Sequence, residues 1–164
     1  MDVRAVINSQ FHAALDMLEQ TIQRCPESVW YDEQPKNQTW QIVYHALFYT
    51  HLYMQPTLDD FVPWANHREE ANSMPTEAAP YSKEEVLDYL SLCRAEVDRC
   101  TAAMELDAAS GFEWLPFGKL ELQFYSLRHR MMHLGEVADR LGAQGIDVDW
   151  RGMKAQAGGV KREA

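Results

Sequence analysis

The sequence has no long hydrophobic run and no apolar leader. None of its 164 residues fall in a segment that approaches the roughly 18 consecutive apolar residues of a membrane-spanning helix. The residues that follow Met1 do not form the apolar stretch of a secretory signal peptide. We therefore expect a cytoplasmic protein without a membrane partner.

Basic residues are scarce relative to acidic ones. The chain has 15 Lys and Arg against 25 Asp and Glu, which gives a formal net charge of -10. Proteins that bind nucleic acids neutralise phosphates with clustered Lys and Arg, and anionic membrane surfaces attract the same residues. The composition therefore argues against a nucleic-acid partner. We interpret the negative charge as a contribution to solubility.

Cysteine is also sparse, with only Cys25, Cys93 and Cys100. The number is odd and no C-x-x-C pair occurs, so a disulfide framework is not expected. Cys93 and Cys100 are seven residues apart and would share one helix face. We interpret them as small core residues, with a redox or ligand role as the alternative.

What the sequence does contain is helical periodicity, which predicts an all-α protein. Apolar residues recur at three- and four-residue steps in four long stretches, and no segment alternates as a strand does. We expect one domain over residues 1–150, followed by a flexible tail over 151–164. Trp150 is the only strong anchor expected after the last helix. The predicted helices cover residues 2–24, 39–54, 83–106 and 120–141.

Local signals set the ends of these helices. Pro26 ends the first helix, because proline cannot continue the hydrogen-bond ladder. Asn37 or Thr39 is the expected cap of the second helix, and Ser82 with Glu85 forms a capping box for the third. Gly142 is the expected left-handed cap at the end of the fourth helix.

A long connection separates the second and third helices. Residues 55–80 contain four prolines and a short apolar island, Leu58-Phe61-Val62-Trp64. A connection of this length indicates a crossover, or a flap over a site, rather than a tight hairpin. We therefore predict a four-helix bundle with a long crossover connection between helices 2 and 3.

Two histidines in the last helix are spaced for a metal ion. His129 and His133 are four residues apart and therefore lie on one helix face. The spacing is weak as a signal, and the zincin motif is excluded because Arg130 stands where that motif needs glutamate. A helical wheel places these histidines opposite the expected aliphatic stripe, on a mixed face that is either a surface patch or a cleft wall. The stripe is Phe124, Leu127, Met131, Leu134 and Ala138.

A third ligand is needed, and His45 is the candidate. It lies in the aromatic second helix, where a neutral imidazole must find a hydrogen bond or a metal. His51 lies on a different face of that helix and is interpreted as packed or hydrogen-bonded. His12 and His67 are expected on the surface.

One histidine in an aromatic second helix, followed by H-x-x-x-H in the fourth, resembles the DinB-like superfamily of metal-dependent bundle proteins. The stretches that carry the resemblance are Thr39–Tyr49, Leu127–Glu136 and Met17–Pro26 with Trp30. The resemblance implies a four-helix bundle whose ligands are His45, His129 and His133, usually for zinc or nickel. Some relatives are thiol-S-transferases or isomerases that use a low-molecular-weight thiol, and others resemble hydrolases.

The function expected from this combination is a metal-dependent enzyme of transferase or hydrolase type that acts on a small-molecule substrate. Three protein ligands leave a coordination position open, as in catalytic zinc sites. A metal-binding sensor without turnover and a metal-free bundle are the alternatives. No catalytic residue is assigned. Glu136 is the weak candidate, as general base or as partner of a ligand, with an exposed carboxylate or an ion pair with Arg140 as the alternative. Tyr125, four residues before His129, either lines the pocket of the metal site or is a packing residue.

A homodimer is also expected. The aromatic residues of the second helix and the apolar island in residues 55–80 supply surface for an interface. The resemblance adds that relatives are frequently dimers.

Overall fold

A computed structural model describes residues 1–155 of the chain, and this part is all-α. It contains five helices and no strands. None of these helices combines the length and the apolar character needed to cross a membrane. The helices are α1 (Val3–Arg24), α2 (Glu27–Trp30), α3 (Thr39–Met54), α4 (Lys83–Ala103) and α5 (Lys119–Gly142). The four long ones match the predicted helices closely, whereas the single turn of α2 lies outside the predicted helices.

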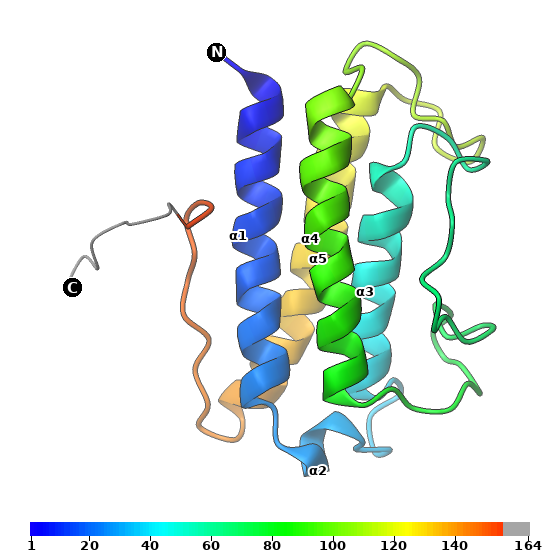
Figure 1. Cartoon of the computed structure of the whole chain (residues 1–164). Helices are drawn as coiled ribbons and strands as arrows, with labels where there is room; N and C mark the ends of the chain where they lie inside the picture. Colours follow the sequence, from blue (N-terminus) through cyan, green and yellow to red (C-terminus); the bar gives the residue numbers. More distant parts are fainter. Residues whose placement is uncertain (156–164) are drawn as a thin grey trace.

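The four long helices lie side by side (Figure 1). Helix α1 packs against α4 and α5, and α3 packs against the same two helices. Helices α3 and α4 run in the same direction, so the connection between them returns along the length of the helices before α4 begins (Figure 1). The long connection is thus a consequence of this parallel pair.

The helix starts follow capping chemistry, with one departure from prediction. The Asp2 side chain accepts hydrogen bonds from the backbone of α1, and Ser82 with Glu85 forms the predicted capping box of α4. The cap of α3 is Gln38, and its backbone N–H donates to the Gln41 side chain over 2.8 Å. The prediction of Asn37 or Thr39 is wrong. The Thr39 hydroxyl instead donates to the carbonyl of Val29, at 2.7 Å.

The end of α5 uses a different glycine from the predicted one. Gly142 is the last helical residue, and Gly145 takes the left-handed conformation with φ 72°. The N–H of Ile146 donates to the carbonyl of Leu141 at 3.0 Å, and the N–H of Gly145 donates to Gly142 at 2.9 Å. This is the Schellman pattern of bonds, with Gly145 in the position that glycine favours.

The buried stripe of α5 is rotated from the predicted one. Of the predicted stripe only Leu134 is fully buried, and Phe124 is 64% exposed. The prediction is wrong because polar side chains occupy much of the true buried face. The buried residues of α5 are Lys119, Leu122, Gln123, Ser126, Arg130, His133, Leu134, Val137 and Leu141.

Helix α3 is buried on nearly all sides, as its aromatic sequence predicts. Trp40, Tyr44 and Tyr53 are each at most 4% exposed, so these rings belong to the core of one chain rather than to an outer surface. In the apolar island, Trp64 is also buried, whereas Leu58 and Val62 are 48% and 75% exposed.

After α5 the chain turns back along α1 (Figure 1). Polar contacts hold this segment: Gln20 and Asp149 exchange two hydrogen bonds, and Arg24 donates to the carbonyl of Asp147. Trp150 is 74% exposed, so the expectation that it anchors the segment is wrong. Of the predicted flexible tail, residues 156–164 lie outside the described residues.

Candidate metal centre

The three predicted ligands come together between α3 and α5. The Nε2 atom of His129 lies 3.2 Å from Nε2 of His45 and 3.2 Å from Nε2 of His133. One ligand nitrogen from each of the three residues lies within 4.8 Å of the others. This convergence joins residues 84 positions apart in the chain, and neither helix alone provides it.

Hydrogen bonds at the far side of two rings determine which nitrogen carries the proton. Nδ1 of His45 lies 2.7 Å from the backbone carbonyl of Asn72, and Nδ1 of His133 lies 3.0 Å from the Glu136 carboxylate. Both partners are acceptors, so both Nδ1 atoms donate a proton. The Nε2 atoms of these two residues therefore present lone pairs to the centre of the cluster, as metal-binding histidines do.

Burial favours the neutral form of two of the three rings, His45 and His129. It lowers the pKa of His45 to about 4, against a hydrogen bond to Asn72 that acts the other way. It also lowers the pKa of His129 to about 4, and the neighbouring His133, His45 and Arg130 lower it further. Both rings are thus uncharged at neutral pH, which is the form that binds metals.

The residues present fit a divalent metal. Two nitrogens bound at 2.0–2.1 Å in tetrahedral geometry are separated by about 3.3–3.4 Å, close to both Nε2 contacts of His129. Hydrogen bonding among the rings does not satisfy all three, because the single Nε2 proton of a neutral His129 can serve only one neighbour. The Nε2 lone pair of the other neighbour is then left without a donor in the cluster, and a bound cation would accept it.

Aromatic rings surround the cluster. Tyr49 packs against His45 and His129, with centroid distances of 4.6 and 5.6 Å. Tyr125 is half-buried and stacks parallel to His129 at 6.4 Å. It also contacts Tyr53, at 5.9 Å, so it both packs and borders the cluster. His133 is only 4% exposed, whereas His45 and His129 are half-buried, so the cluster lies at the edge of the core.

Glu136 bonds to a candidate ligand. Its carboxylate contacts Nδ1 of His133. Arg140, which the sequence offered as an ion-pair partner of Glu136, instead donates to the hydroxyl of Thr39 at 3.1 Å. The carboxylate is 47% exposed, so it connects a buried imidazole to solvent. This placement agrees with a residue that orients a ligand.

The other histidines lie elsewhere. His51 is buried and lies 3.2 Å from the Tyr89 hydroxyl, which confirms the hydrogen-bonded interpretation. The surface prediction for His12 is wrong, since His12 is 5% exposed. His67 is half-buried, and its Nδ1 lies 2.6 Å from the Tyr44 hydroxyl. These partners lie too far along the chain for local periodicity to indicate them.

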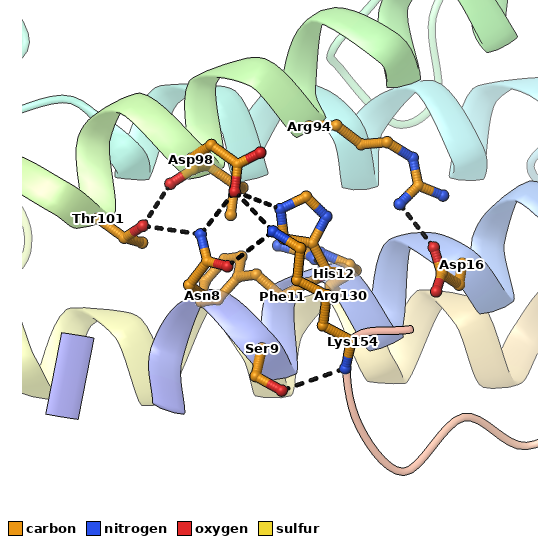
Figure 2. Close-up of polar contacts among 11 residues, drawn as sticks. Asn8, Ser9, Phe11, His12, Asp16, Arg94, Asp98, Thr101, Arg130 and Lys154 are labelled. Atoms are coloured by element: carbon orange, nitrogen blue, oxygen red, sulfur yellow. Dashed lines mark hydrogen bonds and ion pairs between the residues drawn. The ribbon is translucent and has the colours of Figure 1, made fainter. Parts of the chain in front are cut away.

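A second polar cluster joins α1 to α4 (Figure 2). Asp98 accepts hydrogen bonds from Asn8 at 2.9 Å, from His12 at 2.8 Å and from Lys154 at 2.9 Å. Partial burial raises the pKa of Asp98, but these three donors outweigh it and hold the pKa well below its usual value. In this cluster the Asp98 carboxylate already gives His12 a hydrogen-bond partner.

Sequence reasoning missed two contributors to the candidate metal centre. The carbonyl of Asn72 has no sequence signal, because any residue supplies a backbone carbonyl. Arg130 did have a signal: it is spaced with Ser126, His133 and Val137 at the steps of a buried face. The three cysteines are free and buried, in agreement with core residues.

Comparison with protein-family models, with curated proteins and with solved structures found no match. The geometry of the cluster therefore carries the functional argument.

Proposed function

We propose that this chain is a DinB-like metal-binding protein and a metal-dependent enzyme, with zinc or nickel held by His45, His129 and His133. The observation that carries the proposal is the convergence of three Nε2 atoms, with two of the rings oriented from behind by acceptors. As part of this proposal, α1, α3, α4 and α5 form a four-helix bundle with a crossover between α3 and α4.

Each residue of the site has a distinct task in this proposal. The three imidazoles offer their Nε2 atoms, the carbonyl of Asn72 and the carboxylate of Glu136 hold two of the rings in orientation, and Tyr49 packs against His45. Three protein ligands leave room for one more. The chemistry that a divalent metal supplies when bound there is Lewis acidity toward a water or a thiol.

The reaction class that we favour is thiol transfer or hydrolysis of a small molecule, with a low-molecular-weight thiol as co-substrate in the first case. The test is an assay of the zinc- and nickel-loaded protein with model electrophiles, several small thiols and activated esters, compared with His133→Ala. We expect turnover by the wild type that His133→Ala loses. Equal inactivity of the two proteins with every substrate would leave a metal-binding module without turnover.

We also propose a cytoplasmic homodimer. Because the aromatic side chains of α3 are largely buried, the exposed Leu58 and Val62 of the α3–α4 connection are the remaining part of the expected interface. Light scattering coupled to size-exclusion chromatography tests it, and a monomer at all concentrations would refute it.

A further inference from the structure

Arg130 places a cation in the core without a carboxylate partner. The side chain is 0% exposed, its Nε donates to the Thr50 hydroxyl at 2.8 Å, and one terminal nitrogen donates to the carbonyl of Phe11 at 3.2 Å. The guanidinium also lies 4.4 Å from the centre of the Phe11 ring, and both residues are seen in Figure 2. Within residues 1–155, the other terminal nitrogen has no hydrogen-bond partner and no acidic side chain pairs with the group.

Stability alone does not explain such a residue. Taking a charge out of water is costly, and replacing buried ionic groups by apolar side chains of similar size is often neutral or stabilising. Conformational specificity is one documented use of buried polar groups, so the contacts of Arg130 indicate what it specifies.

Those contacts connect the two helices that carry the histidines. Arg130 follows His129 directly in α5, and its partner Thr50 lies on α3. The Thr50 hydroxyl in turn donates to the carbonyl of Ala46, at 2.7 Å, and Ala46 follows His45 directly. Two hydrogen bonds therefore link the residue beside one candidate ligand to the residue beside another.

We propose that Arg130 is a positioning residue for the metal centre: through Thr50 it holds α5 against α3 so that His129 and His133 meet His45. The bond to Phe11 adds α1 as a third support. This inference rests on the proposed function, because it requires that the three histidines bind a metal.

Electrostatics and positioning make opposite predictions for this residue. A positive charge beside His129 repels a metal cation, so removing it would strengthen binding if charge were its main effect. If Arg130 positions the ligands, removing it weakens binding. The sign of the change therefore separates the two roles.

The experiment measures zinc affinity of purified apoprotein by competition with a chromophoric chelator, the visible spectrum of the cobalt-loaded protein, and the apoprotein melting temperature. Arg130→Met removes the donors and keeps the length, and Thr50→Val removes the same link from the other side. The matched control is Arg128→Met, since Arg128 flanks His129 on its other side and is exposed. Thr50→Ser keeps the hydroxyl.

We expect Arg130→Met and Thr50→Val each to weaken zinc binding about 10- to 100-fold, the usual effect of losing support behind a metal ligand. The cobalt spectrum should change in both variants. The apoprotein melting temperature should stay the same or rise in Arg130→Met and should fall in Thr50→Val, because the buried guanidinium there keeps its charge and loses an acceptor. Arg128→Met and Thr50→Ser should bind zinc as the wild type does.

Two outcomes would overturn the inference. Unchanged or tighter zinc binding by Arg130→Met, with wild-type affinity in Thr50→Val, contradicts positioning while the metal site stands. If Arg130→Met does not fold, Thr50→Val decides alone. If the wild type binds neither zinc nor cobalt, the proposed function fails and the inference fails with it.

Discussion

Two histidine-containing clusters lie between different helix pairs, and they differ in what satisfies them. Between α1 and α4, His12 pairs with the carboxylate of Asp98, and Asn8 and Lys154 complete the network. Between α3 and α5, three imidazoles face one another, and the one carboxylate at hand, on Glu136, lies behind His133. The first cluster has its hydrogen-bond partners within the chain, whereas the three imidazoles of the second do not all satisfy one another. The difference indicates that a polar cluster is a candidate site when its own partners do not satisfy it.

The substitution with the largest expected effect disrupts the α3–α5 cluster and leaves the α1–α4 cluster intact. His133→Ala should weaken zinc binding by more than about 100-fold, beyond the effect of losing an outer support, because it removes a ligand. His12→Ala removes a buried histidine from the α1–α4 cluster and should leave zinc affinity unchanged. Isothermal titration of the two apoproteins checks the pair, and equal affinities would contradict the assignment of the ligands.

Substitution of Glu136 tests whether its hydrogen bond to His133 supports metal binding. Glu136→Ala should weaken zinc binding about 10-fold, because the orientation of His133 is no longer held. The matched control is Glu121→Ala, a carboxylate in the first turn of the same helix. Chelator competition measures both variants, and a wild-type affinity for Glu136→Ala would limit this carboxylate to a solvent contact.

Substitution of Asp98 tests the α1–α4 cluster. Asp98→Asn should lower the free energy of unfolding by about 1 kcal/mol, because charge-assisted bonds from His12 and Lys154 weaken. The effect is modest because the Asp98 side chain is 53% exposed and water screens it. Urea unfolding gives the value. A change in zinc affinity in this variant would show that the two clusters are coupled.

The two clusters also differ in how they make stability depend on pH. Burial lowers the pKa of His45 and His129 from 6.5 to about 4, so between these values the unfolded chain binds more protons than the folded one. The stability of the apoprotein should therefore rise with pH across that window, and these two groups contribute no further change above it. The pKa of Asp98 is held below its ordinary 3.8, so its contribution is present above that pH and is lost as the pH falls below it.

Urea unfolding at a series of pH values measures both windows. Replacing His45 and His129 together by Gln should reduce the rise between pH 4 and 6.5 and leave the loss below 3.8 unchanged. His51, whose pKa burial also lowers, keeps part of the rise. An unaltered rise in the double variant would contradict the burial of neutral imidazoles.

Periodicity was enough to predict the long helices, because apolar spacing and caps such as Ser82 act within a few residues. It failed on the core face of α5, where Arg130 and His133 are buried and Phe124 is exposed. Hydrophobic pattern assigns polar residues to the surface, so a buried polar stripe rotates the expected face. Long-range partners such as Asp98 for His12 have no local signal at all.

The candidate ligands were reached by spacing for His129 and His133, and by resemblance for His45. The structure brings all three together. What sequence did not supply is the support behind them, since the carbonyl of Asn72 is a backbone group and the link through Thr50 depends on how α3 and α5 pack.

The most direct test of the metal centre is the metal content of freshly purified protein, measured by inductively coupled plasma mass spectrometry for the wild type and for His129→Ala. We expect about one zinc or nickel per wild-type chain, because three convergent histidines supply one site, and none in the variant. No stoichiometric metal in the wild type, with no rise in melting temperature when zinc or nickel is added, would contradict it.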